Sequence, residues 1–331
     1  MSNNTLNSRR PIPSLFCLKA LCALFVVIIH SHIWGKDALA PVTQVAVPCF
    51  FAISGYFLFS GNPEKEIRTA LRWAKKGFIL QIFLLFVYGC FFRIYNHTGE
   101  YVWQTYVIAL LSGVGIVAHL WYLAALWQAL VIFALIRRWV GNPAVIIILC
   151  LLADRVVQLY LLPLFPFNAS LLKVACFSAL VYICGGYAVA KYKWGRSPLF
   201  LLLVPVILGL IPEFCGVSSL LPSAVRRVFH VAVLGVISAS LVAACVKKPE
   251  WSLPWVAWIG KNHAANIYYY HIIISTMLPD VARCLFGIDT TLYSAWVTYP
   301  LTLLLSVIIV AVSSRVKRFV DKRRAGENPR P

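Results

Sequence analysis

Ten apolar segments, each long enough to cross a lipid bilayer, constrain the fold of this chain more than any other feature. A helix needs roughly 20 residues to span about 30 Å of hydrocarbon, and inside a bilayer its backbone groups must bond to one another. Hydrophobic residues make up 61% of the chain, whereas soluble domains are about 45–50% apolar. The segments are residues 15–34, 41–60, 74–95, 119–138, 143–161, 171–190, 198–214, 227–246, 264–280 and 292–314. They predict an all-α fold, a polytopic transmembrane helix bundle of about ten spans.

The charged residues separate the apolar segments and indicate the orientation of the bundle. The formal net charge is +19, but the cations lie in loops and tails. This is the positive-inside pattern of a membrane protein and argues against a nucleic acid as a partner. The cation-rich segments are residues 9–19, 68–76, 137–138, 191–196, 247–261 and 315–324. Their alternation predicts that both termini are cytoplasmic. Arg226 and Arg227 break the pattern at the outer end of the eighth span, which suggests contact with an anionic substrate.

The polar segments are too short to form a soluble domain. We therefore expect one membrane-embedded domain over residues 1–331, with short basic cytoplasmic tails at 1–14 and 315–331. The first apolar run has about 20 residues, against 7–15 in a signal peptide core, and is interpreted as a retained span. Residues 103–117 are apolar but short. They are compatible with a re-entrant segment, an interfacial segment or an eleventh span.

The ten cysteines are scattered, most of them inside apolar runs. None forms a CxxC pair or a Cys/His spacing typical of a metal site. We interpret them as small apolar side chains, and we predict neither a disulfide framework nor a structural metal.

Lys19 and His30 are a polar pair within the first apolar segment. Eleven helical residues turn the chain by three turns plus roughly 20°, so both side chains share one face, about 16 Å apart along the axis. Polar groups inside a membrane span are costly and suggest a functional site. A neutral imidazole is a good general base near pH 7. The alternatives are a structural histidine bonded between helices and a lysine that extends to the membrane surface.

Two further spans hold polar residues of interest. In the second, Ser54 and Gly55 allow a neighbouring helix to approach closely, and Tyr56 supplies a hydroxyl group. Asp154 is the one acid deep inside a predicted span, and the adjacent Arg155 is its expected partner. That pair is compatible with a substrate cavity or with a purely structural role.

Six segments, in this order, resemble the acyltransferase-3 family of integral membrane O-acyltransferases, which modify bacterial sugars and envelope glycans. They are Lys19 with His30, residues 47–58 (VPCFFAISGYFL), Arg72 with Lys75, residues 119–126 (HLWYLAAL), residues 184–191 (CGGYAVAK) and residues 258–274 (WIGKNHAANIYYYHIII). The lysines at positions 19 and 75 depart from the arginines that are commoner in the family. Tyr268 and His271 match a tyrosine and a histidine of the last motif.

The resemblance implies a donor and an acceptor. The family takes an acyl group, here expected to be acetyl, from cytoplasmic acyl-CoA and places it on a hydroxyl group of a glycan or lipid-linked sugar. The expected location is the bacterial cytoplasmic (inner) membrane. Arg72 and Lys75 suit the CoA phosphates, because guanidinium and ammonium groups bind phosphate. The alternative is that they are ordinary positive-inside anchors. Lys65 is excluded, because Glu64 and Glu66 flank it and are expected to neutralise that part of the loop.

The resemblance also makes His30 the expected general base and recasts Lys19 as a cation that positions the donor. A developing oxyanion needs a hydrogen-bond donor. Ser54, Tyr56, Asn266 and Tyr268 remain open for that role. The other candidates for contact with substrate or oxyanion are His119, Asp154, Arg155, Arg226 and His271. For His119 an interfacial position beside Trp121 and Tyr122 is an equal alternative.

Two other functions are compatible with these residues. A transporter of a polar solute or proton would use His30, His271 and Asp154 as a relay. Transporters often contain internal repeats, and none is evident here. A non-catalytic membrane partner would have no use for Lys19 and His30.

Overall fold

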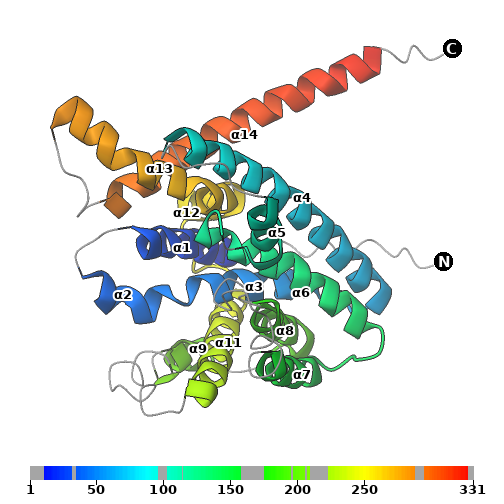
Figure 1. Ribbon diagram of the computed structural model, residues 1–331. Coiled ribbons are helices and arrows are strands. Elements are labelled where there is room, and N and C mark those ends of the chain that lie inside the picture. Colours follow the sequence, from blue (N-terminus) through cyan, green and yellow to red (C-terminus); the bar gives the residue numbers. More distant parts are fainter. Residues whose placement is uncertain are drawn as a thin grey trace.

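The computed structural model is an all-helical bundle, with no strand in any part of the chain that it describes (Figure 1). It describes residues 11–31, 35–95, 103–113, 115–157, 175–194, 197–205, 207–208, 223–287 and 294–326. The helices are α1 (Pro13–His30), α2 (Lys36–Thr43), α3 (Ala46–Leu58), α4 (Pro63–Tyr95), α5 (Trp103–Ser112), the 3₁₀ turn η1 (Ala118–Leu120), α6 (Trp121–Arg137), α7 (Pro143–Val156), α8 (Cys176–Tyr192), α9 (Pro198–Pro205), α11 (Ser223–Lys247), α12 (Pro254–Asn262), α13 (Ala264–Phe286) and α14 (Ser294–Gly326).

Within the described residues, six helical stretches are long and apolar enough to cross a membrane. They are Pro13–His30, Lys36–Leu58, Pro63–Tyr95, Ala118–Arg137, Val225–Lys247 and Ala295–Arg315. The apolar helices support a multi-pass membrane protein. Of the four other predicted spans, 143–161, 171–190 and 198–214 extend into residues outside those described. The fourth, 264–280, lies in the fully described α13, which is not among the six stretches. The count of ten spans and the cytoplasmic position of both termini therefore stay predictions.

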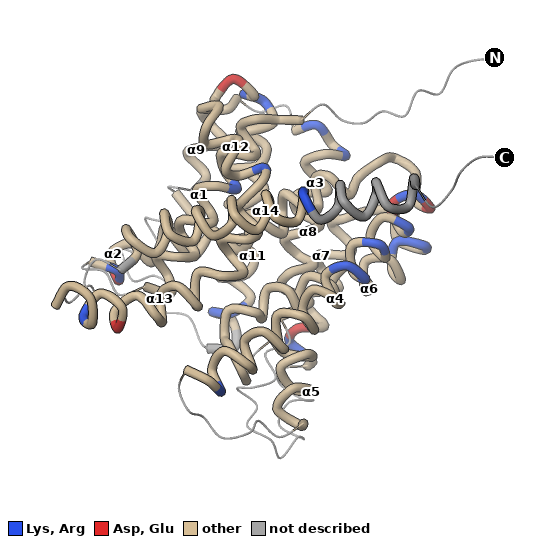
Figure 2. Tube along the Cα trace, turned by 90° about the horizontal axis from the view of Figure 1, so that it is seen from above, with Lys and Arg blue, Asp and Glu red and all other residues tan. Residues whose placement is uncertain are grey.

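Helices α1 and α3 form the centre of the bundle. Helix α1 packs against α12 and α13, and α3 packs against α8 and α11, while α14 extends beyond the bundle (Figure 1). In Figure 2 the Lys and Arg residues lie mostly at or near helix ends, and the long middle stretches carry few charges. Charges at the ends and apolar side chains between them are what a bilayer requires of its spanning helices.

A pair of glycines permits the closest packing in the centre. A Cβ atom at Gly55 of α3 would lie 1.8 Å from the carbonyl oxygen of Ile183 in α8, and one at Gly186 would lie 1.8 Å from that of Ala52. Only glycine fits at either position, so the two backbones meet directly. This is the close approach expected from Ser54–Gly55, and small residues serve the same purpose in other membrane helices.

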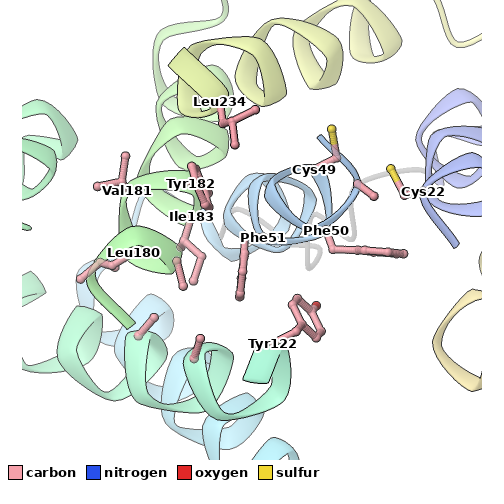
Figure 3. Close-up of a cluster of buried hydrophobic side chains, with 14 of the residues drawn as sticks. Cys22, Cys49, Phe50, Phe51, Tyr122, Leu180, Val181, Tyr182, Ile183 and Leu234 are labelled. Carbon is pink, nitrogen blue, oxygen red and sulfur yellow. The ribbon is translucent and has the colours of Figure 1, made fainter. Parts of the chain in front are cut away.

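Aromatic residues fill the space beside this crossing. Phe50 and Phe51 of α3 point toward Tyr122 of α6 (Figure 3), with ring centroids 6.0 and 4.7 Å from it. Tyr182 of α8 stacks on Phe51 from the other side at 6.2 Å. The cluster fixes α3, α6 and α8 relative to one another, and so fixes the loop before α6.

Glu66 corrects one sequence expectation. Its side chain is completely buried, and its carboxylate accepts hydrogen bonds from Arg137 Nε at 2.8 Å and Tyr187 Oη at 2.9 Å. It also accepts from the backbone N–H groups of Ser60 and Gly61 at 2.8 and 2.9 Å. The carboxylate is thus committed to an internal ion pair. The expectation that Glu66 neutralises the surface of the loop beside Lys65 is therefore wrong.

Residues 103–117 do not form an eleventh span. Their helix, α5, has ten residues and is about 15 Å long, half the hydrocarbon thickness. The buried Gln81 holds the end of α5, because its Nε2 donates to the carbonyl oxygens of Ala109 at 3.1 Å and Leu110 at 3.0 Å. Trp127 Nε1 donates to Gln81 Oε1 at 2.7 Å and keeps that amide in place.

Candidate functional site

Three histidines from separate elements meet inside the bundle. His30 ends α1, His119 lies in η1 and His271 lies in the first half of α13. The ring centroids of His30 and His271 are 5.3 Å apart, those of His119 and His271 are 5.1 Å apart, and those of His30 and His119 are 6.2 Å apart. All three were candidates in the sequence, but nothing in the sequence indicates that they form one cluster.

The local backbone explains how His119 reaches the cluster. Gly113 ends α5 with φ of +73°, a conformation that favours glycine. A Cβ atom there would lie 2.1 Å from Cα of Trp121, so only glycine lets the chain turn back closely enough. The returning segment forms η1 and buries the His119 side chain, which is 1% exposed.

The histidine nitrogens are unevenly satisfied. Nδ1 of His271 lies 2.8 Å from the carbonyl oxygen of Tyr268, which can only accept, so Nδ1 carries the proton. In a neutral ring this leaves Nε2 as an acceptor, and it has no hydrogen-bond partner among the described residues. Neither ring nitrogen of His119 has one there. Buried polar atoms are costly without partners, so these nitrogens have hydrogen-bonding capacity that the described residues do not use.

Two cavities lie next to the cluster. The first, here called the lysine cavity, has a volume of about 430 Å³ and is lined by Lys19, Ser54, Lys76 and Tyr122, among mostly apolar residues. The second, the histidine cavity, has about 630 Å³. It is lined by His30, Gln44, Trp121, Ser178, Arg227 and His230, among others. Both volumes are in the range of small-molecule binding sites.

Tyr268 lines both cavities. Its hydroxyl group donates to the backbone carbonyl of His119, and its ring lies 5.0 Å from that of Tyr122. The residue therefore stands between the two cavities and holds η1 in place. That commitment weakens it as a free oxyanion donor. Ser54 is committed in the same way, because its Oγ donates to the carbonyl oxygen of Phe50 at 2.9 Å.

An ionic cluster forms part of the wall beside the histidine cavity. Asp154 Oδ2 accepts from Arg155 Nη2 at 2.8 Å and lies 3.5 Å from Arg227 Nε. Of the two adjacent arginines, Arg227 faces the cavity, whereas Arg226 is exposed and is not among the residues that line it. The sequence identified both arginines but could not distinguish them.

The cations of α4 also differ in whether they line a cavity. Lys76 lines the lysine cavity, as does Lys19. Arg72 and Lys75 are exposed, as Lys76 is, but are not among the residues that line it. Tyr56 lines a different cavity, together with Lys193 and Lys247. The structure therefore brings Lys19, not Tyr56, to the lysine cavity, which shares Tyr268 with the histidine cavity.

Tyr88 is a residue of the site that the sequence did not reveal. Its ring packs 5.1 Å from that of His119, and its hydroxyl donates to the carbonyl oxygen of Tyr269 at 2.7 Å. It thus supports both His119 and the backbone beside His271. Tyr88 lies in an apolar run of α4 with no motif around it, so no signal in the sequence could have marked it.

The geometry unites a base, hydrogen-bond donors and two binding spaces. A neutral imidazole at the edge of a cavity can take a proton from a hydroxyl group. A second imidazole N–H nearby can stabilise developing negative charge. The arrangement is suited to transfer between two ligands that enter from different cavities.

Comparison with known proteins gives one match. A family model described as an acyltransferase domain matches residues 12–315, nearly the whole chain. No curated protein and no solved structure matched.

Proposed function

Because the chain belongs to the acyltransferase-3 family, we propose that this acyltransferase moves an acetyl group from acyl-CoA to a sugar hydroxyl. The acceptor would be a glycan or a lipid-linked sugar at the outer face of a bacterial cytoplasmic membrane. One observation carries the proposal. His30, the expected base, lines a cavity that shares one lining residue, Tyr268, with the lysine cavity. Family membership favours this enzyme over the transporter that the histidines alone would also allow.

We assign the lysine cavity to the donor. CoA carries several phosphates, and Lys19 and Lys76 are the cations among the residues that line this space. Lys19 lies about 16 Å along α1 from His30, which fits a cation that holds the polar end of a long thioester arm. Arg72 and Lys75, exposed on the same helix as Lys76, would contact phosphates that remain outside the cavity.

We assign the histidine cavity to the acceptor. His30 accepts the proton of the acceptor hydroxyl as the oxygen attacks the thioester carbon. The tetrahedral intermediate then collapses, the carbon–sulfur bond breaks and the ester forms. His30 returns its proton to the departing sulfur, which leaves as the thiol of CoA. No water, metal or redox partner is needed to balance this step.

The other two histidines have supporting roles in this mechanism. The His119 ring has no hydrogen-bond partner among the described residues and lies 6.2 Å from the ring of His30, although it lines neither cavity. Its N–H would stabilise the oxyanion that forms beside His30. Nε2 of His271 is an acceptor beside His30 and can stabilise the imidazolium that forms there. His271 is thus a positioning residue.

The test combines a deletion strain with complementation. Mass spectrometry of the envelope polysaccharides should show the loss of one acyl mass in the deletion strain. The wild-type gene should restore that mass, and a His30→Ala variant present at equal level in the membrane should not. An unchanged glycan profile in the deletion strain would contradict the proposed acceptor class.

A further inference from the structure

The cluster of Asp154, Arg155 and Arg227 has an unusual charge balance. Asp154 is 4% exposed and lies within an apolar helix. Charged groups inside a membrane bundle are costly and pair with one another. Here one carboxylate faces two guanidinium groups, so the cluster retains one positive charge.

The geometry directs that charge to the histidine cavity. Arg155 makes the short contact with Asp154, and its side chain is 18% exposed. Arg227 makes the longer contact, from Nε at 3.5 Å, and its side chain is 38% exposed and lines the cavity. Because its side chain is more than a third exposed and lines the cavity, the guanidinium of Arg227 can reach a ligand there. A guanidinium fork matches the two oxygens of a carboxylate or phosphate.

The cavity contains other groups suited to a polar ligand. Ser178 and Gln44 line the same space and offer hydroxyl and amide groups. His30 lines it as well, so a ligand held by Arg227 lies in the same cavity as the proposed base. Asp154 Oδ1 is buried and has no hydrogen-bond partner among the described residues. Through Oδ2, Asp154 contacts both arginines, so it positions Arg227 while its single negative charge is shared between two cations.

We infer that Arg227, positioned by Asp154, binds an oxyanion of the acceptor and so selects acidic sugars or sugar phosphates over neutral ones. The inference rests on the proposed function only in calling the ligand of this cavity an acceptor. The shared chemistry is an anionic group with two or three oxygens. A uronic acid and a sugar phosphate are its two sources.

Binding to the purified protein without acyl-CoA tests the inference separately from acyl transfer. Saturation-transfer NMR would compare glucuronate with glucuronamide, and glucose 1-phosphate with glucose. The wild type should bind the anion at least about tenfold more tightly in one pair, because a charge-assisted hydrogen bond is worth more than a neutral one. The pair that shows the preference identifies the source of the oxyanion.

Two arginine variants form a matched set. Arg227→Gln should abolish the preference for the anion and leave the uncharged sugar unaffected, while Arg227→Lys should keep part of it. Arg226→Gln removes the same charge from the adjacent exposed residue and should keep the preference. Equal binding of anion and uncharged sugar by the wild type overturns the inference. So does loss of the preference in Arg226→Gln instead of Arg227→Gln, or equal weakening of both sugars in Arg227→Gln.

The two proposals fail in different ways. If acyl transfer does not depend on His30, the proposed function fails while the binding preference can persist. If the preference is absent but His30→Ala abolishes acyl transfer, only the role of Arg227 fails.

Discussion

His30 and His271 lie with their ring centroids 5.3 Å apart, although one ends the first helix and the other lies near the end of the chain. Packing of α1 against α13 creates this contact. Nδ1 of His271 is held by the carbonyl oxygen of Tyr268, so its Nε2 is available beside His30. The contact gives the proposed base a neighbour that can share its proton.

Replacing His30 by alanine should abolish acyl transfer. General-base catalysis contributes about 10²–10⁴-fold, so the rate should fall by at least about 100-fold. The measurement is release of the CoA thiol by membranes that contain the variant at wild-type level. Wild-type activity in His30→Ala would remove the proposed base.

Replacing His271 by phenylalanine keeps a ring of similar size but removes both nitrogens. If His271 supports the imidazolium on His30, kcat should fall by about tenfold or more, and KM for acyl-CoA should change little. Steady-state kinetics separates the two constants. A purely packing role would instead leave kcat unchanged in folded His271→Phe.

Lys76 and Lys75 are adjacent, and only Lys76 lines the lysine cavity. Lys76→Ala should therefore raise KM for acyl-CoA by about tenfold, because a charge-assisted contact to phosphate is lost. Lys75→Ala and Arg72→Ala should have smaller effects, because those side chains do not line the cavity. A larger effect at Arg72 than at Lys76 would place the phosphates on the outer surface of α4.

Glu66→Gln should destabilise the protein strongly. It removes the charge that pairs with the half-buried Arg137, and breaking a buried ion pair costs about 3 kcal/mol. The thermal unfolding midpoint of the purified protein measures the effect. Glu64→Gln is the matched control, since Glu64 lies in the same turn but is exposed. Equal midpoints for the two variants would show that the buried network contributes nothing to stability.

Gly55→Ala should separate α3 from α8. The added Cβ would lie 1.8 Å from a backbone oxygen, which cannot move aside as a side chain can. The free energy of unfolding should therefore fall by about 1–3 kcal/mol. Gly77→Ala is the control, because a Cβ there meets its nearest atom at 3.5 Å, an ordinary contact. Alanine also favours the helix, so Gly77→Ala should be neutral or stabilising. A comparable loss of stability in Gly55→Ala and Gly77→Ala would contradict the packing described for Gly55.

Much of the fold could be predicted because hydrophobicity is a local property. The apolar runs that predict spans at 15–34, 41–60, 74–95 and 119–138 correspond to helical stretches long enough to cross a membrane. Where a run is interrupted or short, as at 103–117, the sequence left several structures open. The ten-residue α5 is too short for an eleventh span. Its packing against α6 and the turn at Gly113 determine the structure of this segment.

The sequence by itself determined the chemistry available to this protein: apolar helices, a polar Lys19–His30 stripe and the motifs of an acyltransferase family. Tertiary structure alone decided which polar groups act together. It buried Glu66, turned Lys76 rather than Lys75 toward a cavity, and joined His119 and His271 to His30. The physical reason is that adjacent residues of a helix differ in direction by about 100°. Which of those directions faces a cavity is set by helix–helix packing, and that packing depends on contacts between residues far apart in the chain.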